Sequence, residues 1–200
     1  MIDTELKRKI AHLGTGLFIA ITYYLGLLKQ KHLFFLMILF IVLSLLSKKF
    51  KIPIVNLLLK HFERKRDLKK FPFKGMIFFL GGCLLTVKIF EKDIALASII
   101  ILSLGDSMSF LVGNFLGKIK FKFNKLKNVE GILAGALFAF LGSLFFVSVT
   151  ESFFASLIAM IVEGAGVKIG VSDIDDNFIV PLVAGTVIYL FRTGFKIFLF

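Results

Sequence analysis

The chain has 200 residues, of which 58% are hydrophobic and 26 are Phe, and its mean hydropathy is +0.91. A soluble domain holds about 45–50% apolar residues, so this composition excludes an ordinary soluble enzyme and predicts an all-α, polytopic transmembrane helical bundle. The net charge is +12, which is typical of nucleic-acid-binding proteins and also of membrane proteins with basic cytoplasmic loops. Because the basic residues lie between apolar runs, we expect a lipid bilayer as partner and no nucleic acid.

About seven apolar runs are long enough to be candidates for membrane-crossing helices. They cover residues 10–28, 32–47, 73–90, 94–117, 131–150, 152–166 and 176–192. The first run follows a basic start, but it is too long for the apolar core of a signal peptide, so we predict that it is the first span. With three prolines and no flexible linker, residues 1–200 are predicted to form a single domain.

The basic residues alternate between the loops, which predicts how the spans are oriented. They are dense before the first span and in residues 48–72 and 118–130, and sparse or missing in the loops between. The positive-inside rule therefore places the N-terminus and these two loops in the cytoplasm. Within the first of these loops, apolar and basic residues alternate over residues 54–66. This pattern favours an amphipathic helix in the headgroup plane, with a solvated basic loop as the alternative.

Polar residues gather in four clusters where the predicted spans meet the cytoplasm. In the first cluster, Glu5, Lys9 and His12 follow one another at helical spacings of four and three, so they share one face of a helix, and Arg8 lies four residues before His12. The alternative for the basic residues is a simple topology anchor. The alternative for His12 is a hydrogen bond between helices.

The second cluster is centred on Asp106, which lies deep in the apolar run 94–117. A carboxylate in hydrocarbon costs on the order of 3 kcal/mol, so an acid at this depth is predicted to be functional. Ser109 and Gly113 lie on the same stripe of the helix, and Gly117 and Lys118 end the segment. The two glycines also fit the small-residue packing of neighbouring membrane helices.

The third cluster lies between a basic loop and the fifth span. It contains Lys125, Lys127, Asn128, Glu130 and Gly131. Free N–H groups at a helix N-terminus favour an anion, so lysines followed by a glycine at this point predict a phosphate cradle. Glu130 could alternatively be an acid that is favoured by the helix dipole.

The fourth cluster contains Glu163 at the end of the sixth span and Asp176, Asn177 and Pro181 at the start of the seventh. Carboxylate and amide oxygens suit Mg²⁺, which is usually held by one or two carboxylates together with substrate phosphates. Lysines suit a nucleoside triphosphate, and phosphoryl transfer needs mainly positioning and charge stabilisation. The sequence lacks a P-loop and has too few Cys and His residues for a zinc site.

Taken in order, the four clusters resemble the family of dolichol kinases, phytol kinases and CTP-dependent diacylglycerol kinases. The matching segments are residues 5–12, 105–118, 127–131 and 176–182 with Glu163, and residues 71–81 match more weakly. The resemblance implies an integral membrane enzyme that uses CTP and a divalent metal to phosphorylate the hydroxyl of a lipid alcohol, releasing CDP. Ser109 and Asn128 depart from the family pattern, which has alanine and Ser or Thr at these positions.

The clusters and the resemblance together give a set of predicted site residues. The predicted catalytic residues are Asp106, Glu130 and Glu163. The predicted nucleotide-binding residues are Arg8, Lys9, Lys118, Lys125, Lys127, Asn128 and Gly131. The predicted metal ligands are Asp106, Asp176 and Asn177, with His12, Ser109, Gly113, Gly117 and Pro181 in supporting roles.

Two other functions stay open from the sequence. The segments around Asp106 and Glu130 also resemble the CDP-diacylglycerol synthase group, which transfers a cytidylyl unit to a lipid phosphate. A small transporter would instead use Asp106 and Glu163 as an ion path. The sequence does not distinguish polyprenol, dolichol, phytol and diacylglycerol as acceptors, and it leaves a homo-oligomer open.

Overall fold

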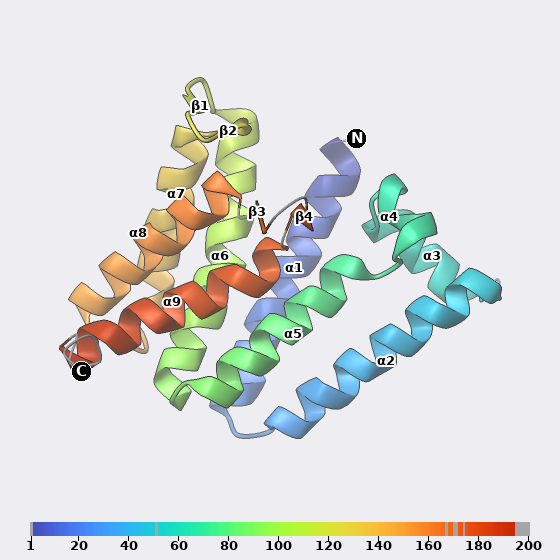
Figure 1. The fold of residues 1–200 in the computed structure, drawn as a ribbon, viewed down its shortest axis with the longest axis horizontal. Helices are drawn as coiled ribbons and strands as arrows, with labels where there is room; N and C mark the ends of the chain where they lie inside the picture. Colours follow the sequence, from blue (N-terminus) through green and yellow to red (C-terminus); the bar gives the residue numbers. More distant parts are fainter. Residues whose placement is uncertain (1, 51, 167, 170–171, 174, 195–200) are drawn as a thin grey trace.

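The computed structural model describes residues 2–50, 52–166, 168–169, 172–173 and 175–194 (Figure 1). The helices are α1 (Ile2–Tyr24), α2 (Gln30–Lys49), α3 (Pro53–Phe62), α4 (Lys65–Lys70), α5 (Lys74–Ile89), α6 (Lys92–Phe115), α7 (Val129–Ser143), α8 (Val149–Ala165) and α9 (Asp176–Thr193). Two short antiparallel pairs lie in loops: β1 (Lys120–Phe121) with β2 (Asn124–Asn128), and β3 (Lys168–Ile169) with β4 (Ser172–Asp173). The prediction of an all-α fold is therefore confirmed.

Each apolar run forms a helix, but the helix ends differ from the predicted bounds. Helix α1 begins at Ile2, well before the predicted start at residue 10. Helix α7 ends early, at Ser143, because the chain turns there and begins α8. Ser148 caps α8, because its hydroxyl accepts a hydrogen bond from the Glu151 N–H at 3.4 Å, and the Glu151 carboxylate accepts one from the Ser148 N–H at 2.9 Å. By length and apolar composition, α2 and α6 are long enough to cross a membrane, and the count of seven spans stays a prediction.

Helix α6 lies at the centre of the bundle and contacts α1, α5, α7, α8 and α9 (Figure 1). Its contact with α7 is made by glycines. A Cβ placed on Gly135 would lie 2.7 Å from the carbonyl oxygen of Gly105, and one placed on Gly131 would lie 2.8 Å from the Cα of Gly113. The two helices therefore pack backbone against backbone, as the small-residue reading of Gly113 predicted.

Helices α3 and α4 fill the basic loop between α2 and α5. Pro53 at the first turn starts α3, where its missing N–H is tolerated. Val55 and Leu59 pack into a small core with Phe73 and Ile77, whereas the opposite face of α3 exposes Ile54 and other apolar residues. The prediction of an amphipathic helix is confirmed in its helical part; its place at a membrane surface stays a prediction.

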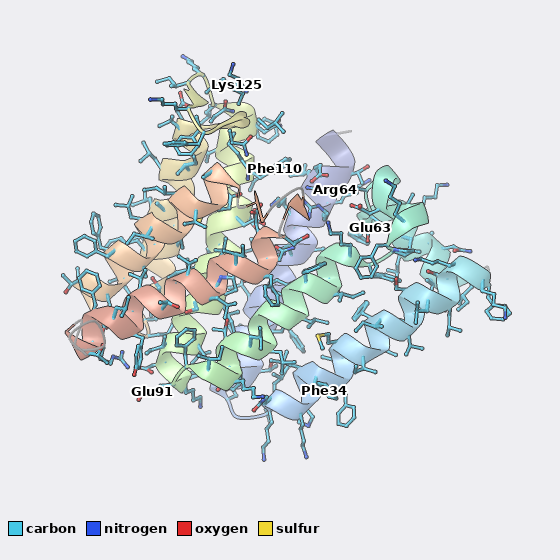
Figure 2. The ribbon with its side chains drawn as sticks, viewed as in Figure 1. Phe34, Glu63, Arg64, Glu91, Phe110 and Lys125 are labelled. Atoms are coloured by element: carbon cyan, nitrogen blue, oxygen red, sulfur yellow. The ribbon has the colours of Figure 1, made fainter. Side chains whose placement is uncertain are left out.

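The predicted cytoplasmic segments lie toward one end of the bundle. Figure 1 shows the N-terminus, α4 and the β1–β2 hairpin in its upper part, with the start of α9 below them near the centre of the bundle. At the opposite end, Arg192 forms ion pairs with Glu91 (3.2 Å), Asp93 (2.8 Å) and Glu151 (3.2 Å), which tie α9 to the starts of α6 and α8. Figure 2 shows this separation between Lys125 on the hairpin and Glu91 at the far end.

Candidate functional site

The centre of the site is the Asp106 carboxylate on α6, which faces two basic residues of α1. One oxygen, Oδ1, forms an ion pair with the Lys9 ammonium, and the other, Oδ2, lies 3.7 Å from Nε2 of His12. All three side chains are more than nine-tenths buried. The sequence offered no basic partner in the span of Asp106; the structure brings one from another helix. This partner, Lys9, lies on the helical face that the sequence predicted for Glu5, Lys9 and His12.

The contact between α1 and α6 depends on small residues. A Cβ at Gly16 would collide with the side chain of Ser103 on α6, so only glycine permits this approach. Directly after Asp106 in the sequence, the hydroxyl of Ser107 donates a hydrogen bond to the backbone carbonyl of Lys9 at 3.2 Å. These contacts set the position of α1 along α6 and hold Lys9 opposite Asp106.

A second ion pair joins the half-buried Lys127 of β2 to Glu163 of α8. Glu163 is fully buried, and its Oε2 accepts a hydrogen bond from the Ser109 hydroxyl at 3.4 Å. Ser109 lies one helical turn from Asp106, so the two ion pairs lie close together. Burial alone would lower the pKa of the Lys127 ammonium, but the facing carboxylates of Glu163, Asp106 and Asp176 outweigh it and raise that pKa.

The β1–β2 hairpin is fastened to the end of α6. The side-chain amide of Asn128 donates a hydrogen bond to the Gly113 carbonyl at 2.5 Å, and a Cβ at Gly117 would collide with the Asn128 side chain. The Glu130 carboxylate accepts hydrogen bonds from the N–H groups of Lys118 and Ile119, each at 3.0 Å. A hydrogen bond from its own backbone N–H, followed by those from Lys118 and Ile119, holds the pKa of Glu130 below its usual range.

The structure therefore gives the predicted residues of the hairpin region different surroundings. Glu130 is bound to backbone amides and lies outside the two ion pairs, although it was predicted to be catalytic. Gly131 is buried in the seam with α6, and Lys118 and Lys125 are exposed near the hairpin, where Figure 2 labels Lys125. Of the lysines predicted to bind nucleotide from this segment, Lys127 is the one brought to the buried acids.

The start of α9 completes the polar region. The carboxylate of Asp175 caps this helix by accepting a hydrogen bond from the Asn177 N–H at 3.2 Å, and the Asn177 side chain donates one to the Gly75 carbonyl at 3.3 Å. Pro181 is buried one turn further along α9. Among the described residues, no three His, Cys, Asp or Glu side chains gather as a set of metal ligands.

Arg8 is held at the rim of this region by a network that the sequence did not indicate. It forms an ion pair with Glu5 at 2.8 Å, and Arg64 binds the other oxygen of Glu5 at 2.7 Å. Burial would raise the pKa of Glu5, but the hydrogen bonds and charges of both arginines outweigh it and lower the pKa to about 2. Arg64 was missed because nothing in the sequence separates it from the other basic residues of its loop.

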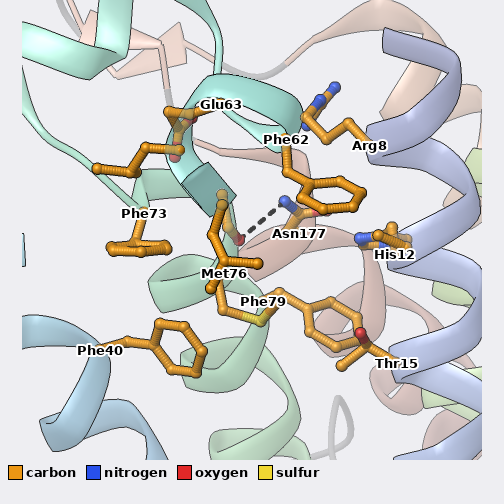
Figure 3. Close-up of a pocket in the computed structure, with 14 residues that line it drawn as sticks. Arg8, His12, Thr15, Phe40, Phe62, Glu63, Phe73, Met76, Phe79 and Asn177 are labelled. Atoms are coloured by element: carbon orange, nitrogen blue, oxygen red, sulfur yellow. Dashed lines mark hydrogen bonds between the residues drawn. The ribbon is translucent and has the colours of Figure 1, made fainter. Parts of the chain in front are cut away.

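A cavity of about 260 Å³ lies beside His12, which forms part of its wall (Figure 3). We call it the His12 cavity. Its walls come from α1, α2, α3, α5 and α9 and are mainly apolar. They are formed by Arg8, Ala11, His12, Thr15, Phe40, Leu58, Leu59, Phe62, Glu63, Phe73, Gly75, Met76, Phe79 and Asn177. The sequence did not indicate this cavity, because Phe and Leu residues occur throughout the chain and carry no distinctive pattern.

Comparison with known proteins supplies relatives for the whole chain. It is 32% identical over 189 residues to an uncharacterized protein of Methanocaldococcus jannaschii, and the match covers 92% of each chain. It is 28% identical over 142 residues to CTP-dependent diacylglycerol kinase 1 of Schizosaccharomyces pombe, covering 62% of this chain and 63% of the kinase. It is 24% identical over 211 residues to the probable chloroplastic phytol kinase 3 of Glycine max, and the match covers 92% of this chain and 62% of that kinase.

The chain thus spans less than two thirds of the length of both named kinases. No family model and no solved structure matches it. The order of the four polar clusters, their convergence around α6 and the two kinase relatives agree with one another. The chain belongs to the family of dolichol kinases, phytol kinases and CTP-dependent diacylglycerol kinases.

Proposed function

We propose that this protein is an integral membrane kinase that transfers the terminal phosphoryl group of CTP to the hydroxyl of a membrane lipid alcohol. The observation that carries the proposal is two neighbouring ion pairs on buried acids: Lys9 with Asp106, both buried, and the half-buried Lys127 with the fully buried Glu163. Burying a charged pair in an apolar bundle rarely adds stability over well-packed apolar residues. Two such pairs side by side are therefore better explained by chemistry on a charged substrate.

The nucleotide is proposed to reach Lys127 from the basic end of the bundle. Lys127 keeps 27% of its side chain exposed, whereas its partner Glu163 is fully buried, so the ammonium lies between solvent and the acids. The exposed Lys118 and Lys125 on the neighbouring segment add positive charge at the same end. A concentration of lysines there attracts the triphosphate and draws it toward the buried acids.

Phosphoryl transfer in this site is proposed to follow a simple exchange of bonds. The oxygen of the lipid hydroxyl forms a bond to the γ-phosphorus, the bond from that phosphorus to the β,γ-bridging oxygen breaks, and CDP leaves with the electron pair. The hydroxyl proton passes to a carboxylate of the site. We assign this role to Oδ2 of Asp106, because Oδ1 is occupied by Lys9.

The residues present fit a divalent metal that the nucleotide itself largely holds. Mg²⁺ commonly takes one or two protein carboxylates and fills its other positions with phosphate oxygens and water, so it needs no cluster of three acids. Asp176 would supply a carboxylate and the neighbouring Asn177 an amide oxygen, because the charge of Asp176 acts on Lys127 and Asp106 is already assigned to the hydroxyl proton. When bound, the metal neutralises charge that develops on the phosphate oxygens.

The proposed orientation places this site at the cytoplasmic surface of a membrane bundle of about seven spans. The N-terminus, α4 and the β1–β2 hairpin lie in the upper part of Figure 1, which supports a common side for the basic segments. CTP is a cytoplasmic nucleotide, so a basic cytoplasmic entrance suits it. The lipid alcohol would reach the site laterally from the bilayer.

Purified protein with CTP, Mg²⁺ and a polyprenol should release CDP. Asp106→Asn should lower kcat by about 10²–10⁴-fold, and Lys127→Ala should lower kcat/KM for CTP at least about tenfold. Lys122→Ala is the matched control, because Lys122 is an exposed lysine of the same hairpin. Normal rates in both site variants would overturn the assignment. Release of pyrophosphate in place of CDP would favour the cytidylyltransferase, and absence of CTP binding would favour a transporter.

A further inference from the structure

The His12 cavity and Lys127 lie next to different carboxylates of the site. His12 lines the cavity and also faces Asp106, whereas Lys127 faces the acids through Glu163 on α8. Figure 3 shows His12 at one wall of the cavity, opposite Phe73 and Met76. We propose that this cavity receives the hydroxyl end of the lipid alcohol, so that the acceptor and the nucleotide bind on opposite sides of Asp106. The inference rests on the proposed kinase activity.

The unpartnered nitrogen of His12 is the first argument for a ligand. Nε2 of His12 is buried and has no hydrogen-bond partner, since its nearest acidic oxygen is too distant at 3.7 Å. Buried polar atoms in folded proteins are nearly always paired, so one left open beside a cavity needs an explanation. A hydroxyl in the cavity supplies a polar group at the wall that leads to Asp106.

The lining of the cavity is the second argument, because it suits an apolar chain and not a nucleotide. Several walls of the cavity are apolar and are formed by Phe40, Phe62, Met76 and Phe79. Among the described lining residues, Arg8 is the one side chain with a permanent positive charge. Arg8 is already paired with Glu5. A triphosphate would lack charge partners here, whereas a hydrocarbon chain would fill the space.

The size and opening of the cavity agree with a lipid that is only partly enclosed. A volume of about 260 Å³ lies below the roughly 300–1,000 Å³ of sites that enclose a drug-sized ligand. It therefore suits a headgroup and the first segment of a chain. Leu58 and Phe62 of α3 line the cavity and are 43% and 41% exposed, so the wall at α3 is also outer surface. The rest of the chain would leave beside α3 into the bilayer.

The backbone at Phe73 is the third argument. Phe73 has φ 60°, a left-handed conformation that is rare for a bulky aromatic residue. This bend places its ring in the cavity wall, edge-on to Phe40 with 5.3 Å between ring centroids. Backbone strain of this kind persists mainly where the fold holds a site in shape. A cavity wall built at such a cost is better explained by a ligand than by packing.

Adjacent leucines of α3 provide a matched test. Leu58 lines the cavity, whereas Leu57 does not line it and is 59% exposed. In nanodiscs with CTP, Leu58→Trp should fill the cavity and raise the KM for farnesol or a longer polyprenol by about tenfold or more, with the KM for CTP unchanged. Leu57→Trp should keep both constants near wild type. Equal effects of the two variants, or a change in the KM for CTP alone, would overturn the proposal.

A second readout does not depend on turnover. A farnesol analogue that carries a diazirine should crosslink to residues 58–62 and 73–79, and His12→Leu should weaken that crosslinking while CTP still shifts the thermal unfolding midpoint. Crosslinks confined to other helices would overturn the cavity assignment even if the enzyme is active. If wild-type protein crosslinks in the cavity but forms no CDP with any alcohol, the kinase proposal fails and the lipid site stands.

Discussion

Lys9 of α1 and Asp106 of α6 form a buried ion pair across 97 residues of sequence, with side chains only 8% and 5% exposed. Asp106 is conspicuous in the sequence because it lies in an apolar run, whereas Lys9 is one of several basic residues near the N-terminus. Their pairing links the first and the central helix at the depth where the proposed chemistry takes place. Each charge therefore keeps the other from being isolated in an apolar interior.

Removing one member of this pair should be more harmful than removing both. Lys9→Met leaves the Asp106 carboxylate buried without its partner and should destabilise the protein by about 3–5 kcal/mol. The double variant Lys9→Met with Asp106→Leu replaces both charges by apolar groups and should be clearly more stable than the single variant. Denaturant unfolding in detergent micelles measures the difference. A double variant as unstable as the single one would show that the pair is not the source of the effect.

The glycine seam between α6 and α7 should not tolerate a methyl group. Gly135→Ala would place its Cβ 2.7 Å from the Gly105 carbonyl, so the helices would have to separate, with a loss of about 1–3 kcal/mol. Gly14→Ala is the control, because Gly14 lies within α1 with nothing within 4 Å of its added Cβ. That change should stabilise α1 by about 0.5–1 kcal/mol. Thermal unfolding should therefore move in opposite directions in the two variants.

Glu130 should act on nucleotide affinity and not on the chemical step. Glu130→Gln weakens the hydrogen bonds to the N–H groups of Lys118 and Ile119, which hold the hairpin that carries Lys127. We expect the KM for CTP to rise several-fold while kcat at saturating CTP stays near the wild-type value. Glu91→Gln, at the other end of the bundle, should change neither constant. A large fall in kcat for Glu130→Gln would return this residue to the catalytic group in which the sequence placed it.

The ion pairs of Glu5 should make stability depend on acidic pH. The pKa of Glu5 is lowered from 4.5 to about 2, so the paired carboxylate adds stability that is complete above its unfolded pKa and is lost as pH falls from about 4.5 to 2. The loss is at most about 3 kcal/mol and is reduced by partial exposure. Glu5→Gln and Arg64→Gln should both flatten this part of the stability profile, as followed by circular dichroism. An unchanged slope in both variants would contradict the role of this network.

The helices could be predicted from hydropathy because each apolar run is long and bounded by charged residues. The exact ends could not, since α7 stops at Ser143 within a continuous apolar run, where a turn and the cap at Ser148 decide the boundary. The β1–β2 hairpin was also missed. Its residues Lys120–Asn128 are mostly basic or amide residues, which carry little strand preference, and their pairing depends on the contacts of Asn128 and Glu130.

The sequence predicted most residues of the candidate site but not which of them form ion pairs with one another. Motif order located Asp106, Lys127, Glu163 and the basic face of α1, because charged residues beside apolar spans stand out in a sequence. The partners of those charges depend on which helices touch, and this information is tertiary. The His12 cavity could not be predicted from the sequence, because its wall consists mainly of ordinary apolar side chains and includes Phe73, whose backbone angle is unusual.

The seam of α6 and α7 has a consequence for how these segments can change over evolutionary time. Gly105 and Gly113 meet Gly135 and Gly131, so the glycines that seem to belong to two separate motifs are the two halves of one contact. A larger residue on one helix requires a rearrangement on the other, and neither half can drift alone. We therefore expect natural variants at these four positions to occur together, and chimaeras that exchange only one of the two helices between relatives to assemble poorly.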